Sequence, residues 1–290
     1  MKNSAMLSKY LLKRFQIIPL LALIITDMMV IDRLTSNREI PFWRFFFSFV
    51  FVLAYLFHNR VADDKRDYKF DMEYYPDRDL QKGIISISFL ERASFLMIGL
   101  MIIISILMGQ LSIMFFLPLL FYTILAKKDF FFPDNFKIKY LFTYNIINML
   151  QILLLQIFIY VSILDDLILD NILLFHILLV FILSIQVEIT RKTKPIISKG
   201  NELYSDRLGM KGAIMLWMFF GVGSIVISAT ICVLLGLNIK DILFYEAIIF
   251  TICFISGFTY LKNPTSFSEN IFWFGLLVSY IGQNLILIYV

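Results

Sequence analysis

The sequence predicts an all-α integral membrane protein. Its 290 residues are 60% hydrophobic and only 17% charged, whereas a soluble domain carries about 25% charged residues. Apolar runs of the length needed to cross a bilayer, about 20 residues, recur along the whole chain. Most basic residues lie in the loops on one side of these runs. The lipid bilayer is therefore the main expected partner, and the net charge of +4 needs no nucleic acid to explain it.

Nine apolar runs are candidate transmembrane helices. The first follows a basic N-terminal tail and ends in Asp32 and Arg33. Because no small-residue cleavage site follows it, we expect a helix here and not a signal peptide. The third and fourth runs are separated only by Gly109 and Gln110, which favours a tight helical hairpin. The runs cover residues 15–31, 42–59, 93–109, 111–126, 139–164, 168–187, 212–236, 242–261 and 271–290.

The distribution of Lys and Arg predicts the topology of these nine spans. With the N-terminus in the cytoplasm, 22 of the 26 Lys and Arg residues fall on the cytoplasmic side and 3 fall outside, as the positive-inside rule requires. The C-terminus is then outside. Both long polar stretches, residues 59–92 and 188–211, face the cytoplasm. No repeat or soluble domain interrupts the chain, so residues 1–290 are expected to form a single domain.

The composition also suggests where the protein resides. A multi-pass chain of this kind belongs in a cell membrane. Richness in Ile, Lys, Phe and Asn is what an AT-rich bacterial genome would encode. We therefore expect a bacterial cell-membrane protein.

Acidic and amide side chains recur every four residues at the start of the first polar stretch. Asn59, Asp63, Asp67 and Asp71 would lie on one face of a helix, one turn apart. Like charges at this spacing repel, so a cation is expected among them. Oxygen ligands suit magnesium, which keeps several waters and bridges to phosphate oxygens. The interleaved bases allow a second interpretation, a solvated helix end without a ligand.

The same stretch resembles the first motif of the UbiA-type membrane prenyltransferase superfamily. The resemblance implies an all-helical fold with nine spans around a central cavity and two cytoplasmic motif loops. One departure is Asp79, where the family usually has proline. The matching residues, in order, are Asn59, Asp63, Asp67, Pro76, Arg78, Leu80, Gly83, Ile85 and Ser86.

The resemblance implies roles for individual residues. Asn59, Asp63 and Asp67 would hold Mg²⁺ against the diphosphate of a prenyl substrate, with Asp63 and Asp67 the catalytic pair. The metal would stabilise the diphosphate as the allylic carbon–oxygen bond breaks. Three bases, Arg78, Lys82 and Lys128, could bind phosphate; contact with lipid headgroups is the alternative. Asp71 is a weaker candidate.

The second polar stretch resembles one branch of the same superfamily. Most members have two aspartates there, whereas this branch reads Glu-x-x-Arg-Lys followed by a Tyr-Ser segment. Glu188, Arg191, Lys192, Tyr204 and Ser205 fit that pattern. Glu188 would remain as a metal ligand, the two bases would neutralise phosphate, and a second full magnesium site is in doubt. Alternatively, the bases are ordinary membrane anchors. Asn145 and Tyr204 are weaker site candidates.

Three functions follow from these observations. The leading one is an intramembrane prenyltransferase that moves an isoprenoid group from a prenyl diphosphate to a hydrophobic or aromatic acceptor, for which an aromatic ring or a quinone precursor is expected. The second is a terpene cyclase that ionises the same diphosphate without an external acceptor. The third is a non-enzymatic transporter or lipid-binding membrane protein, which predicts charges near the bilayer midplane; here the charges gather at one face. No residue stands out as the base that would deprotonate a ring.

Overall fold

The computed structural model describes residues 7–8, 10–12, 17–133, 136–166, 170–196 and 202–289, and within them every regular element is a helix. Eight of these helices are long and apolar enough to cross a membrane, which confirms an all-α, multi-pass membrane protein. The eight are α3 (Phe42–Arg66), α5 (Ile87–Met108), α6 (Gln110–Lys127), α8 (Leu141–Leu164), α9 (Asn171–Arg191), α10 (Tyr204–Leu234), α11 (Ile239–Lys262) and α12 (Ser266–Tyr289).

A further long helix, α2 (Ile17–Leu34), lies on the first predicted span. It carries Asp27, Asp32 and Arg33 within its 18 residues and is not among the eight helices that are long and apolar enough. Nine membrane crossings therefore stay a prediction. The shorter elements are α4 (Tyr68–Tyr74), η1 (Asp129–Phe131) and α7 (Phe136–Lys139).

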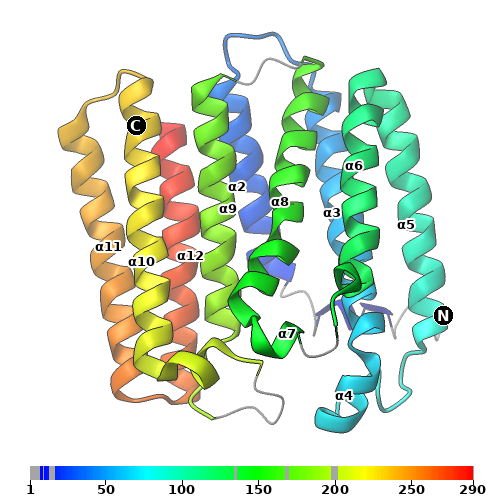
Figure 1. Cartoon of the computed structure of the whole chain (residues 1–290). Helices are drawn as coiled ribbons and strands as arrows, with labels where there is room; N and C mark the ends of the chain where they lie inside the picture. Colours follow the sequence, from blue (N-terminus) through cyan, green and yellow to red (C-terminus); the bar gives the residue numbers. More distant parts are fainter. Residues whose placement is uncertain are drawn as a thin grey trace. The chain divides into compact units, whose positions relative to one another are not determined.

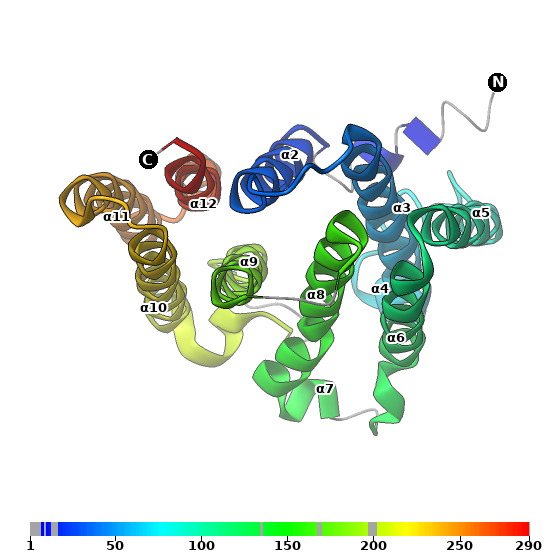
Figure 2. The same cartoon turned by 90° about the horizontal axis from the view of Figure 1, so that it is seen from above.

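The chain forms two compact units, and α2 and α8 contribute residues to both. Unit 1 comprises residues 1–25, 39–132 and 157–167, and unit 2 comprises residues 26–38, 133–156 and 168–290. Figures 1 and 2 label the helices of each unit in two views.

The core of unit 1 packs α3 against α5, α6 and the end of α8. The ring of Phe51 in α3 stacks on Phe158 of α8, with 4.0 Å between ring centroids. Phe116 of α6 meets the Phe51 ring edge-on. Such pairs add about 1 kcal/mol each to the free energy of burial. They hold α3 rigidly, and α3 is the helix that carries the acidic residues of the first motif.

One end of unit 1 is fixed by an arginine and a glycine. Gly109 separates α5 from α6 with a φ of 115°, a backbone conformation that favours glycine. This is the tight hairpin that the sequence predicted. Arg44 donates to the carbonyl oxygens of Ser162 (2.6 Å) and Met108 (3.4 Å) and pairs with Asp165 at 2.8 Å. It thereby places a cation at the negative ends of α5 and α8.

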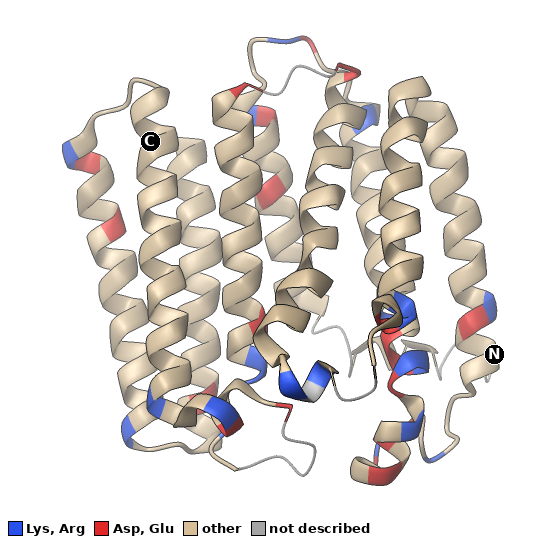
Figure 3. Cartoon of the chain, in the orientation of Figure 1, with Lys and Arg blue, Asp and Glu red and all other residues tan. Residues whose placement is uncertain are grey.

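The opposite end of unit 1 is charged and carries the first motif. Helix α3 continues to Arg66, past the predicted end of the span at residue 59. Figure 3 shows Lys, Arg, Asp and Glu gathered where α3 meets α4. In the same unit, one buried apolar cluster is formed by Tyr10, Phe57, Val61, Leu80, Ile85 and Leu90.

Unit 2 contains a bundle of α9, α10, α11 and α12 in which each consecutive pair packs together. The ring of Phe272 stacks on Tyr260 at 5.3 Å and contacts Trp217 at 4.8 Å between centroids. Helix α10 begins at Tyr204, before the predicted residue 212, and bends at Gly209, whose φ is 67°. The earlier start brings Tyr204 into the helix and so fixes its position.

Candidate functional site

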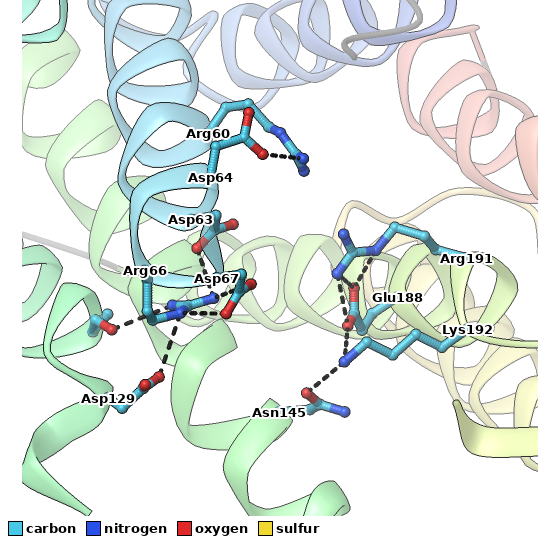
Figure 4. Close-up of polar contacts among 11 residues, drawn as sticks. Arg60, Asp63, Asp64, Arg66, Asp67, Asp129, Asn145, Glu188, Arg191 and Lys192 are labelled. Carbon is cyan, nitrogen blue, oxygen red and sulfur yellow. Dashed lines mark hydrogen bonds and ion pairs between the residues drawn. The ribbon is translucent and has the colours of Figure 1, made fainter. Parts of the chain in front are cut away.

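Arg66, at the end of α3, is the centre of an acidic cluster in unit 1. The guanidinium is only 10% exposed and lies 2.9 Å from Asp63, 3.4 Å from Asp67 and 3.3 Å from Asp129. It also donates to the carbonyl oxygen of Ala126 at 3.3 Å. Figure 4 shows the carboxylates arranged around this one cation. We call Asp63, Arg66, Asp67 and Asp129 the acidic cluster.

Asp129 reaches this cluster because the chain makes a left-handed turn after α6. Asp129, Phe130 and Phe131 have φ values of 49°, 55° and 56°, a conformation that costs roughly 1–2 kcal/mol per non-glycine residue. Nothing in the residue types of this segment predicts the turn, so the sequence did not indicate Asp129. Strain of this kind recurs at functional sites, which is consistent with a role for the carboxylate.

The acidic cluster has an excess of negative charge. Counted over its four residues, three carboxylates and one guanidinium, the cluster has a formal charge of −2. The three acids are 31–40% exposed, so a ligand can reach them from solvent. In the described parts of the chain, no three His, Cys, Asp or Glu side chains converge as a ready-made metal cage. Magnesium does not need one, because it is commonly held by one or two carboxylates together with waters and phosphate.

The predicted row of four polar residues is divided between two helices. Asn59 and Asp63 lie one turn apart in α3, and Asp67 ends that helix. Asp71 lies in α4, where it is buried and forms an ion pair with Arg78. The Arg78 guanidinium also stacks over the ring of Tyr75 at 4.1 Å. Because the chain turns at Asp67, Asp71 pairs with Arg78 and is not part of the acidic cluster.

The two lysines predicted to bind phosphate in unit 1 have other contacts. Lys82 pairs with Asp77 at 2.9 Å, and this hydrogen bond holds the pKa of the exposed Asp77 carboxyl below its usual value. The ammonium of Lys128 lies 5.3 Å from the centre of the Phe131 ring. Both lysines lie near the first motif, but the cation that pairs with the carboxylates of the acidic cluster is Arg66.

A second carboxylate on α3 anchors the N-terminal segment. Asp64 is buried, accepts a hydrogen bond from the hydroxyl of Tyr10 at 2.6 Å and pairs with Arg60 at 2.6 Å. Because Asp64 follows Asp63 directly, its side chain points to another face of the helix. The spacing of Arg60 and Asp64 indicates their pairing, but the sequence alone did not link them to Tyr10.

The second motif forms a compact cluster in unit 2. Glu188, near the end of α9, accepts two hydrogen bonds of 3.0 Å from Arg191 and pairs with Lys192 at 3.0 Å. Lys192 also donates to the amide oxygen of Asn145 at 3.0 Å, and the Asn145 nitrogen donates to the hydroxyl of Tyr204 at 3.1 Å. Figure 4 shows Glu188 between the two cations. We call these five residues the Glu188 cluster.

The local backbone positions the Glu188 cluster. The carbonyl oxygen of Lys192 accepts a hydrogen bond from the backbone N–H of Tyr204 at 2.8 Å. The hydroxyl of Ser205 accepts one from the backbone N–H of Lys194 at 3.0 Å. The end of α9 is thereby joined to the start of α10. Two cations and one carboxylate leave a formal charge of +1, so this cluster suits an anion.

Comparison with known protein families, with curated proteins and with solved structures found no match. The function is therefore inferred from the residues of this chain.

Proposed function

We propose that the protein is an intramembrane prenyltransferase that ionises a prenyl diphosphate with the help of Mg²⁺. The observation that carries the proposal is the acidic cluster, a partly exposed set of carboxylates at the end of the apolar helix α3, whose four residues have a formal charge of −2. An excess of negative charge at that position is stabilised when a divalent cation binds. The similarity of residues 59–86 to the first UbiA-type motif supports the same conclusion.

Asp63 and Asp67 would hold the metal, with Asn59 one turn away as a further oxygen ligand. Bound Mg²⁺ would supply Lewis-acid stabilisation of the departing diphosphate. The role of Arg66 is to keep the two carboxylates in place before the ligand arrives, because its guanidinium pairs with both at once. Such preorganisation lowers the cost of assembling a site during the reaction.

In the Glu188 cluster, Arg191 and Lys192 would donate charge-assisted hydrogen bonds to phosphate oxygens. Glu188 holds both cations, and Asn145 with Tyr204 orients the Lys192 ammonium. Glu188 is the metal ligand that the family pattern implies. Its two cationic partners favour a different role, which is to position the bases.

The hydrocarbon part of a substrate needs an apolar site, and unit 1 contains one. A cavity of about 540 Å³ is lined only by apolar side chains of the N-terminal segment, α2, α3 and α5, among them Ala54, Phe57 and Met97. Its volume is in the range of small-molecule pockets. It borders the same helix, α3, whose end carries Asn59 and Asp63.

The proposal is tested with the purified full-length chain in lipid nanodiscs. Geranyl, farnesyl and geranylgeranyl diphosphates are supplied with aromatic acceptors, and released diphosphate and prenylated product are measured with Mg²⁺ or with EDTA. A transferase requires both the metal and an acceptor. A cyclic hydrocarbon or alcohol formed without acceptor would establish the terpene cyclase instead. No diphosphate release under any of these conditions would exclude both enzymes.

A further inference from the structure

A small polar pocket lies at the charged end of unit 1, between α3, α5 and α6. Its volume of about 20 Å³ is enough for one group the size of a water molecule. The proposed function gives no role to the residues of this pocket, so its contents need an explanation of their own. The polar side chains that line it are His58, Lys65, Glu91, Ser94 and Lys127.

The pocket and the acidic cluster lie on different faces of α3. His58, Ala62 and Lys65 line the pocket and share one helix face, because they are four and three residues apart. Asp63 and Arg66 each follow one of these residues directly, which turns them about 100° around the helix. The pocket is therefore separate from the carboxylates that would hold the metal.

Lys127 gives the pocket a positive charge. Lys65 forms an ion pair with Glu91, so the charges of these two residues cancel. Lys127 is partly buried, and no described carboxylate forms an ion pair with it. The three charged residues together have a formal charge of +1. Because a partly buried cation without a counter-ion is costly, an anion is expected in the pocket.

His58 and Ser94 supply a hydrogen-bond donor. The Nδ1 atom of His58 lies 2.6 Å from the Ser94 hydroxyl oxygen, and their bond uses one hydrogen. A neutral imidazole and a hydroxyl have two such hydrogens between them. The second hydrogen is on Nε2 if the hydroxyl donates, and on the hydroxyl if Nδ1 donates. Neither side chain makes another hydrogen bond with a described residue, so one donor remains for a ligand in either tautomer.

The surface beside the pocket favours a lipid as the source of the anion. Helix α5 is long and apolar enough to cross a membrane. Phe95 lines the pocket and is 67% exposed, and the neighbouring Leu96 is 71% exposed. Exposed apolar side chains on such a helix contact acyl chains, and basic pockets between membrane helices bind anionic lipid headgroups. Ile98, one turn beyond Phe95, also lines the pocket and extends this apolar surface.

We propose that the pocket binds an anionic phospholipid with a single phosphodiester and an uncharged head, such as phosphatidylglycerol. One phosphate oxygen enters the pocket and accepts hydrogen bonds from the Lys127 ammonium and from the His58–Ser94 pair. An acyl chain lies against Phe95 and Ile98. The lipid charge of −1 neutralises the formal charge of +1, whereas a zwitterionic lipid brings a further cation. The bound lipid links α3, α5 and α6 and stabilises the folded state.

The test uses the purified and delipidated full-length chain in detergent. Phosphatidylglycerol, phosphatidylcholine with the same acyl chains, or inorganic phosphate is added in turn. Thermal unfolding measures the stabilisation, and native mass spectrometry measures the bound lipid. We expect phosphatidylglycerol to raise the unfolding temperature saturably by several degrees and to bind at least roughly fivefold more tightly than phosphatidylcholine.

One variant and one matched control locate the binding. Lys127→Gln should lower the affinity for phosphatidylglycerol roughly tenfold, because a hydrogen bond to a charged group is lost. Arg92→Gln changes an exposed base on α5 that does not line the pocket, and its affinity should stay as in the wild type. In the wild type, phosphatidylglycerol with a photoreactive acyl chain should form cross-links to α5 near Phe95 and Ile98.

Three results would overturn the proposal. One is equal affinity for phosphatidylglycerol and phosphatidylcholine. Another is an equal loss in Lys127→Gln and Arg92→Gln, as expected if anionic lipid is attracted to the basic surface in general. The third is equal stabilisation by inorganic phosphate, which would assign the pocket to a free ion. If Lys127→Gln fails to fold, the photoreactive lipid decides, because cross-links that lie only outside α5 exclude the site.

Discussion

The acidic cluster of unit 1 and the Glu188 cluster of unit 2 use the same arrangement with opposite charges. In the first, a partly buried arginine is surrounded by three carboxylates. In the second, a partly buried glutamate lies between two cations. The central residue holds its neighbours in place, and the outer residues supply the excess charge. The first cluster therefore suits a cation and the second an anion. Under the proposed function, these are Mg²⁺ and the diphosphate.

The largest expected effect comes from the outer residues of the acidic cluster. Asp63→Asn and Asp67→Asn should each lower kcat for diphosphate release roughly 100-fold, because each removes a charged contact worth about 3 kcal/mol. The Mg²⁺ concentration needed for half-maximal rate should rise. Steady-state kinetics over a magnesium series measure both. The matched control is Glu73→Gln, which changes an exposed acid on α4. An equal loss of kcat in this variant would contradict the special role of Asp63 and Asp67.

Removing the central residue of the acidic cluster should affect stability. Arg66→Met leaves three like charges together and should lower the free energy of unfolding by about 2 kcal/mol, since the acids are partly exposed and screened. Millimolar Mg²⁺ should restore part of the loss, which thermal unfolding can measure.

Arg60→Met is the control for that experiment. It also breaks an ion pair on α3, but it leaves the single carboxylate of Asp64 hydrogen-bonded to Tyr10. Magnesium should not restore its stability. Equal rescue of the two variants would mean that magnesium acts on the whole protein and not on the acidic cluster.

A smaller effect is expected from the cations of the Glu188 cluster. Lys192→Met should raise KM for the prenyl diphosphate roughly tenfold, because one charge-assisted contact is lost, while the magnesium requirement stays as in the wild type. Lys192→Arg should recover part of the affinity. A changed magnesium requirement with an unchanged KM would assign Lys192 to the metal and contradict the division of roles.

The smallest effect concerns the hydroxyl of Tyr204. Tyr204→Phe removes the acceptor for Asn145, so the free energy of unfolding should fall by about 1 kcal/mol. The KM should change less than in Lys192→Met, because Tyr204 acts through Asn145. A larger rise in KM than in Lys192→Met would show that Tyr204 contacts the substrate directly.

The sequence predicted those parts of the molecule that depend on local patterns. Apolar runs located the long helices, because hydrophobic length alone determines which segments can cross a bilayer. Glu188, Arg191 and Lys192 come together as predicted, because positions three and four apart share a helix face. Tyr204 joins them through a backbone contact between the ends of α9 and α10, which local spacing does not indicate.

The rest depends on the tertiary arrangement. Residue type alone did not distinguish Arg66 from the neighbouring Lys65 as the centre of the acidic cluster. Asp129 reaches that centre through a left-handed turn of non-glycine residues, which has no sequence signal. The row ending in Asp71 was expected on one helix, but the chain turns at Asp67.

The most direct test of the account is metal binding at the acidic cluster. Manganese, a paramagnetic substitute for magnesium, is titrated into the wild type, Asp63→Asn and Glu73→Gln in the presence of an unreactive prenyl thiodiphosphate, and bound metal is measured by electron paramagnetic resonance. If Asp63 holds the metal, binding to the wild type and Glu73→Gln should be saturable, and binding to Asp63→Asn should be at least roughly tenfold weaker. Equal binding to all three proteins would contradict it.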